Sequence, residues 1–298
     1  MATLWHSNSE SRGYAGLRAG WRLALFLVLV AGPLVGFGLA MSSGSGAAAM
    51  HRLPAWVASW LGDGVPLLWL GLVTLVMARM EKRPFGHFGL PGRDAFGGNF
   101  WRGALWGFLG LSLLLALIAA SGGVRLGGLA ASAGMVGSAL AWALVFVTVG
   151  LFEEFCFRGY ALVTLGEGIG FWPAAVTLSA LFGALHLGNS GESAVGALSA
   201  TGIALLFCLT LRRTGNLWFA VGLHAAWDYG ESFVYGVPDS GTTIPTRLMH
   251  PTFSGSHWIT GGSVGPEGSL WVLAVLALLF LLFAKRYPAA KAAAARLA

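Results

Sequence analysis

Eight apolar runs divide this chain of 298 residues, and they constrain its fold more than any other feature. A helix that crosses a bilayer needs about 20 consecutive apolar residues, within a range of about 17–25. The runs extend over residues 22–41, 64–78, 102–120, 137–164, 172–188, 195–211, 217–236 and 270–284. Only 10% of the residues are charged, compared with about 25% in soluble domains. The sequence therefore predicts an all-α fold, a polytopic membrane bundle of about eight transmembrane helices.

The basic residues predict how this bundle is oriented. Most of the 18 lysines and arginines fall before the first run, in the 79–102 connection, after the sixth run or after the last one. Only Arg52, Arg125 and Arg247 fall in connections to the other side. Because cytoplasmic loops carry the excess of Lys and Arg, both termini are expected in the cytoplasm. The same distribution accounts for the net charge of +6, so no nucleic-acid partner is expected.

The chain is expected to form one membrane domain with three parts. Residues 1–136 contain about three N-terminal helices, residues 137–236 a core of about four helices, and residues 237–298 an outer loop and the last helix. The first run is too long for the apolar part of a signal peptide and is expected to be retained. The lipid bilayer is thus the first expected partner, and the sequence leaves the oligomeric state open.

Three of the apolar runs carry ionisable side chains, which are rare inside membranes and usually face the bundle interior or a water-filled cavity. A single intramembrane His is most often a structural hydrogen-bonding residue, and a Glu–Arg pair can also be purely structural. Such groups on three separate runs favour a functional site. They are Glu153, Glu154 and Arg158 in the fourth run, His186 in the fifth, and His224, Asp228 and Glu231 in the seventh.

Helical spacing separates the roles of the two adjacent glutamates. Glu154 and Arg158 are four residues apart, so they share a helix face and can form an ion pair. Glu153 lies about 100° around the helix, lacks that partner and is the freer carboxylate, as a general base requires. His224 and Asp228 are also four residues apart and share a face. For the three runs to meet at a common depth, the fourth helix must continue past Glu154.

Three short motifs in this part of the chain resemble a known family. The segment "EEFCFR" fits EExxxR, "FGALH" fits FxxxH and "HAAWD" fits HxxxN/D, in that order and each on its own apolar run. The set resembles the CPBP family of intramembrane proteases, which includes the type II CAAX prenyl endopeptidases and bacterial Abi relatives. The resemblance is concentrated in residues 147–236, and the first three runs carry no matching motif.

The resemblance implies a role for each motif residue. Glu153 would be the base that activates a water molecule, and His186 would assist it. Glu154 and Arg158 would hold the catalytic side chains in position without contacting the substrate. The implied reaction is hydrolysis of a peptide bond in a membrane-associated protein or peptide, which makes the chain an intramembrane endopeptidase.

The third motif departs from the usual pattern of the family. His224 and the residue four positions later would stabilise the oxyanion that forms when water attacks a peptide carbonyl. The family usually has Asn at that second position, where this chain has Asp228. An ionised Asp cannot donate a hydrogen bond, so Asp228 is either protonated or orients His224, through a shared water molecule if both lie on one helix.

Alternatives remain open at this point. Glu153, His186 and His224 are residue types found at catalytic zinc sites, although no HExxH spacing occurs, and the resemblance favours a mechanism without metal or other cofactor. Intramembrane Glu, His and Asp also occur in proton-coupled transporters, and a non-catalytic scaffold or immunity protein could keep the same fold. The Ala-, Gly- and Arg-rich composition suggests a bacterium, hence a cytoplasmic membrane, and nothing in the sequence indicates a prenyl group.

Overall fold

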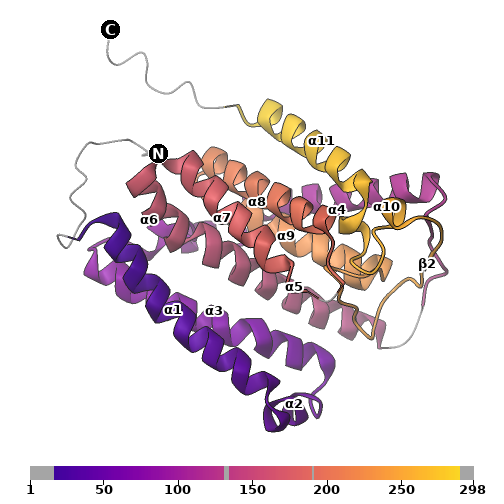
Figure 1. Ribbon diagram of the computed structural model, residues 1–298, viewed down its shortest axis with the longest axis horizontal. Helices are drawn as coiled ribbons and strands as arrows, with labels where there is room; N and C mark the ends of the chain where they lie inside the picture. Colours follow the sequence, from indigo (N-terminus) through magenta and orange to yellow (C-terminus); the bar gives the residue numbers. More distant parts are fainter. Residues whose placement is uncertain (1–16, 131–133, 190, 289–298) are drawn as a thin grey trace.

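The computed structural model describes residues 17–130, 134–189 and 191–288, and these residues form a bundle of helices (Figure 1). The main helices are α1 (Ala19–Ser42), α3 (Ala55–Met80), α4 (Gly98–Ala120), α5 (Met135–Arg158), α6 (Tyr160–Ile169), α7 (Phe171–His186), α8 (Ala194–Thr214), α9 (Trp218–Tyr229) and α11 (Leu270–Arg286). Shorter elements are α2 (Gly44–Met50), η2 (Phe85–Phe88), η3 (Gly92–Asp94), the π-helical η4 (Gly230–Tyr235), α10 (His257–Thr260) and η5 (Pro266–Gly268). In Figure 1, α1 and α3 form one side of the bundle and α11 the other.

Each of the eight apolar runs coincides with helix, but the helix lengths differ from the expected ones. Within the described residues, five helical segments are long and apolar enough to cross a membrane: α1, α3, α4, α5 together with α6, and α8. The second run was expected to be short, at residues 64–78, whereas α3 has 26 residues because the helix begins at Ala55. Helices α7, α9 and α11 have 16, 12 and 17 residues, below the usual length of a membrane span of about 20 residues.

The fourth run forms two helices that together extend from Met135 to Ile169. The first, α5, ends at Arg158, and α6 starts at Tyr160 after a single residue, Gly159. The helix therefore continues past the adjacent glutamates, as the predicted meeting of the polar groups requires. The described helical residues of the segment 137–236, where about four helices were expected, belong to α5, α6, α7, α8 and α9 and to the π-helical η4.

Glycines on α4 and α9 allow these two helices to cross in backbone contact. A Cβ atom added at Gly103 would collide with the carbonyl oxygen of Phe219, and one at Gly107 with that of Leu223. Gly222 on α9 meets the backbone of α4 in the same way. Small residues at four-residue spacing are the usual means of close approach in membrane bundles. This crossing fixes the position of α9, which carries two of the candidate site residues.

A larger side chain at this crossing should therefore destabilise the protein. We expect Gly107→Leu to lower the free energy of unfolding by about 3 kcal/mol, the upper part of the range for overpacking, because it meets backbone that cannot turn aside. The matched control is Gly36→Leu, since an added Cβ at Gly36 in α1 meets nothing within 4 Å. Unfolding in mixed micelles measures both, and equal midpoints would contradict the inferred contact.

One end of the bundle is joined by buried charges. Arg22 on α1 pairs with Glu81 at 2.6 Å and with Glu167 on α6 at 2.6 Å. Arg83 pairs with Glu167, and the Tyr160 hydroxyl donates a hydrogen bond to Glu81. Arg22 and Glu81 are 3% and 1% exposed, so each charge depends on its partner. This cluster attaches the N-terminal helix, which has no family motif, to the core.

At the other end, a small sheet joins two connections that are distant in sequence. Strand β1 (Val124–Arg125) pairs antiparallel with β2 (Thr252–Phe253). An isolated bridge between Leu129 and Met249 extends the contact. The 237–269 connection is therefore folded against the described part of the α4–α5 connection, and both lie at one end of the bundle.

Candidate functional site

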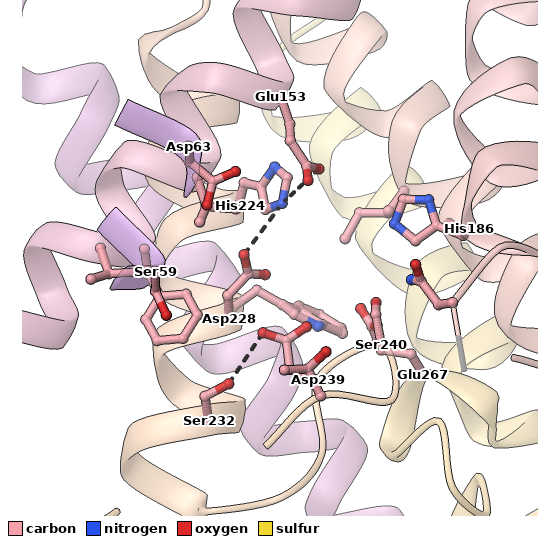
Figure 2. A pocket seen from close by; sticks show the side chains of 18 of the residues that line it. Ser59, Asp63, Glu153, His186, His224, Asp228, Ser232, Asp239, Ser240 and Glu267 are labelled. Atoms are coloured by element: carbon pink, nitrogen blue, oxygen red, sulfur yellow. Dashed lines mark hydrogen bonds and ion pairs between the residues drawn. The ribbon is translucent and has the colours of Figure 1, made fainter. Parts of the chain in front are cut away.

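A cavity of about 280 Å³ lies where the ends of several helices meet the 237–269 connection. Residues of α3, α5, α7, α8 and α9 line it, together with residues from that connection. The four predicted catalytic candidates, Glu153, His186, His224 and Asp228, all line this one cavity (Figure 2). Tertiary packing thus brings together three sequence motifs that are separated by up to 71 positions, as their numbers show.

Glu153 is the more accessible of the two adjacent glutamates. Its side chain is 29% exposed, whereas Glu154 is fully buried. The Oε2 atom of Glu153 lies 3.7 Å from Nε2 of His224. Within the described part of the chain, no hydrogen bond to its carboxylate is found. Glu153 is therefore a carboxylate that faces the cavity and remains able to accept a proton.

Glu154 connects the arginine of the first motif to the histidine of the third. Its Oε1 atom accepts from Arg158 at 3.2 Å, the predicted ion pair, and lies 3.0 Å from Nδ1 of His224. The Arg158 guanidinium is fully buried and lies over the rings of Phe182 and Phe207, at 4.6 and 5.5 Å from their centroids. Such cation–π contacts stabilise a desolvated guanidinium. Glu154 thus holds two partners, where the spacing alone predicted one.

Carboxylates face both ring nitrogens of His224. Nδ1 faces Glu154, while Nε2 lies 3.4 Å from Oδ2 of Asp228 and 3.7 Å from Glu153. The ring stacks on Phe207 with centroids 5.2 Å apart. A doubly protonated ring satisfies this arrangement, because both nitrogens are then donors. Asp228 approaches His224 directly along α9, so a shared water molecule, one of the links considered from the sequence, is not required between them.

His186 is the last residue of α7 and is oriented by its own helix. Its Nδ1 atom lies 2.8 Å from the carbonyl oxygen of Phe182. A carbonyl oxygen only accepts, so Nδ1 carries the proton, and in a neutral ring Nε2 is then an acceptor. Figure 2 shows His186 on the opposite side of the cavity from Glu153 and His224. A molecule in the cavity can therefore contact both sides.

The structure adds acidic residues to the cavity that the sequence analysis missed. Asp63 on α3 lies in the cavity wall, one residue before the predicted start of the second run. The sequence did contain a signal for Asp63, because a charged residue directly at the border of an apolar run is a candidate for a polar site. Asp239 and Glu267 come from the 237–269 connection, and nothing in their sequence context indicated that this connection folds over the helix ends.

The cavity is consequently acidic. Its lining includes five carboxylates and two histidines, but no Lys or Arg among the described residues. Desolvation raises the pKa of the Asp239 carboxyl above its ordinary value, and the negative charges of Asp228 and Glu267 raise it further. The Ser232 hydroxyl donates to Asp239 at 3.2 Å. The lining carboxylates are Asp63, Glu153, Asp228, Asp239 and Glu267.

The described residues offer one group of three His, Cys, Asp or Glu side chains whose ligand atoms all lie within 4.8 Å of one another. This group is Glu231, Asp239 and Glu267. The zinc set considered from the sequence, Glu153, His186 and His224, does not form such a group. Zinc ligands lie about 2.0–2.3 Å from the ion, so those three side chains would have to move closer to hold one.

Comparison with known proteins supports the resemblance noted in the motifs. Residues 135–230 match the family model described as type II CAAX prenyl endopeptidase Rce1-like. This segment contains all three motifs and is about a third of the chain. No curated protein matches the chain significantly, and no solved structure does. The predicted resemblance is thus confirmed: residues 135–230 match the model of an Rce1-like type II CAAX prenyl endopeptidase domain, and the long apolar helices indicate an integral membrane protein.

Proposed function

We propose that this protein is an intramembrane endopeptidase that hydrolyses a peptide bond of a membrane-associated protein or peptide with a water molecule activated by Glu153. One observation supports this most strongly. Three motif side chains from three helices, Glu153, His186 and His224, line one cavity within the segment that matches the family. The charge of Glu153 then has a chemical role, because a carboxylate that faces a cavity, 3.7 Å from His224 and across from His186, can transfer protons.

In the proposed mechanism, the carboxylate of Glu153 takes a proton from water as the water oxygen attacks the peptide carbonyl carbon. The acceptor nitrogen of His186 would hold the same water from the other side. Glu153 then delivers the proton to the amine that leaves when the peptide bond breaks. This sequence needs no metal and no cofactor, because the carboxylate accepts the proton and returns it.

His224 would stabilise the negative oxygen of the tetrahedral intermediate. Its Nε2 faces the cavity between two carboxylates, and a donor aimed at the developing charge is a major source of rate enhancement. Glu154 fixes the ring by accepting from Nδ1, and Arg158 fixes Glu154. Asp228 would orient the ring by accepting from the same Nε2 atom before substrate binds, and this N–H would turn to the oxyanion as the intermediate forms.

The test is cleavage of single-span membrane peptides by the purified protein in lipid nanodiscs, carried out in water enriched in oxygen-18. Hydrolysis places one heavy oxygen in the new carboxyl group, which mass spectrometry detects. The Glu153→Gln variant is the negative control. We expect cleavage to persist with a chelator that removes zinc but leaves calcium and magnesium bound. A folded wild-type protein that cleaves no peptide of a broad library would favour the non-catalytic scaffold.

We further propose that the protein acts in the cytoplasmic membrane of a bacterium, with the bilayer and a membrane-associated protein or peptide as its partners. The apolar exterior of the long helices supports the first partner: exposed side chains include Val28 on α1, Leu68 on α3 and Leu140 on α5, each at least 70% exposed. Exposed apolar surface of this extent is typical of lipid-facing helices.

A further inference from the structure

A second cluster of carboxylates borders the cavity and is not used by the proposed hydrolysis; two of its three members line the cavity. It consists of Glu231 in the π-helical end of the α9 segment, Asp239 in the connection that follows, and Glu267 in η5. Their ligand oxygens all lie within 4.8 Å of one another. Three like charges at this separation repel one another where water is excluded, so either protons or a bound cation must offset the repulsion.

Glu231 indicates that the missing group is a ligand. This side chain is fully buried, and neither of its carboxylate oxygens has a hydrogen-bond partner in the described part of the chain. Buried carboxylates are normally paired with a cation, hydrogen-bonded or bound to a metal. The nearest donor is the indole nitrogen of Trp227, which interacts with Glu231 but makes no well-formed hydrogen bond among the described residues. Glu231 is thus an unpaired buried carboxylate directed at two others.

Protein cations do not supply the missing charge. None of the ion pairs found among the described residues involves Glu231, Asp239 or Glu267. The neighbouring hydroxyls orient the cluster instead. Ser232 donates to Oδ2 of Asp239 at 3.2 Å, and Ser240 donates to Oε2 of Glu267 at 2.7 Å. Among the described residues, no hydrogen bond to the second oxygen of either carboxylate is found; Figure 2 shows Asp239 and Glu267 at the cavity with Ser232 and Ser240.

We propose that Glu231, Asp239 and Glu267 bind one divalent cation of the oxygen-preferring class, calcium or magnesium, which fastens the 237–269 connection to the end of the α9 segment. A ligand set of carboxylates alone, without His or Cys, selects these ions over zinc. Calcium takes several carboxylates in flexible geometry, whereas magnesium keeps more of its water. The site is separate from the hydrolytic residues and does not depend on the proposed activity.

The cation would have a defined structural role. Glu231 belongs to a core helix segment, whereas Asp239 and Glu267 lie near the two ends of the 237–269 connection. One ion bound to all three would hold both ends of that connection against the helix. The connection provides part of the cavity wall, so the same ion would set the shape of the cavity opposite Glu153.

The experiment uses the full-length protein in nanodiscs after chelator treatment and dialysis. Calcium and magnesium are titrated separately by calorimetry, and terbium serves as a luminescent calcium analogue excited through tryptophan. We expect saturable binding of one calcium or magnesium ion per chain, in the range of about 10⁻⁴–10⁻³ M found for extracellular calcium modules. Of calcium and magnesium, the ion with the higher measured affinity is assigned as the ligand of this site. Absence of saturable binding by folded wild-type protein would overturn the proposal.

Two variants and one control localise the ion. Glu231→Gln and Glu267→Gln should each weaken binding by at least about tenfold, since even outer-shell changes weaken metal sites by that much. Asp94→Asn serves as the control, because Asp94 is 41% exposed and lies in η3, away from the cavity lining. Unchanged affinity in both glutamine variants would place the ion elsewhere and overturn the proposal.

Thermal unfolding provides a readout that separates a metal site from a cluster held together by protons. Without cation, Glu231→Gln should raise the unfolding temperature, because it removes one repelling charge. With saturating calcium or magnesium the order should reverse, because the wild type gains the bound ion. If the difference between Glu231→Gln and the wild type is the same with and without cation, no ion binds at the cluster and the proposal is wrong. A cluster neutralised by protons would show a difference near zero under both conditions.

Discussion

Replacing Glu153 with Gln is expected to slow peptide hydrolysis by about 10²–10⁴-fold, the usual contribution of a general base. The amide keeps the size of the side chain and its place on α5, but it cannot take a proton from water. Glu153 makes no hydrogen bond within the described chain that the substitution would break, and its side chain is 29% exposed. The protein should therefore remain folded, and single-turnover cleavage in nanodiscs measures the loss directly.

The matched control for Glu153→Gln is Asp63→Asn. Asp63 lines the same cavity from α3 and carries the same charge, but it has no ion pair with His224 among those found in the described residues. If the negative charge of the cavity were all that mattered, the two amide variants would lose similar activity. We expect Asp63→Asn to retain at least about tenfold more activity than Glu153→Gln. Equal losses would contradict the assignment of Glu153 as the base.

Replacing Arg158 with Met should lower the free energy of unfolding by about 3–5 kcal/mol, as breaking a buried ion pair usually does. Glu154 is fully buried and would keep only His224 as a partner. Methionine fills much of the same space and packs well against the rings of Phe182 and Phe207. The expected loss therefore comes from the uncompensated carboxylate and not from an empty cavity. Denaturant titration in mixed micelles measures it.

A second substitution distinguishes charge from packing in this experiment. The double variant Arg158→Met/Glu154→Gln removes both charges of the buried pair. We therefore expect it to regain at least about half of the stability lost in Arg158→Met. Arg93→Met is the surface control, because Arg93 is 81% exposed, and it should change stability by less than about 0.5 kcal/mol. A double variant as unstable as Arg158→Met alone would show that the arginine acts through packing.

The sequence predicted the helical class, the approximate positions of the apolar helices and the motif residues of the site. These are local properties, because apolar length specifies a membrane helix and four-residue spacing places two side chains on one face. The Glu154–Arg158 pair follows from that spacing and is present. The helix bounds were less predictable. Asp63 was missed because the apolar run was taken to begin after it, whereas helix α3 begins nine residues earlier, at Ala55, and contains Asp63.

Other features of the site depend on contacts between distant segments. The bond between Glu154 and His224 joins residues 70 positions apart, and it depends on how closely α5 and α9 approach. At Gly150 on α5, an added Cβ would lie 3.5 Å from Cβ of His224. Periodicity states which face a side chain occupies, but not which helix that face meets or at what depth. The sequence could therefore propose His224 for the site but not identify Glu154 as its partner.

The 237–269 connection shows the difference most clearly. By itself the sequence determined that this segment is polar, rich in Gly, Ser, Thr and Pro, and located between two apolar helices. Only the tertiary structure decided that it folds over the helix ends and brings Asp239 and Glu267 to Glu231. The physical reason is that the fold of such a connection is set by pairing with distant backbone, here β1 with β2, and by buried polar contacts that no local pattern encodes.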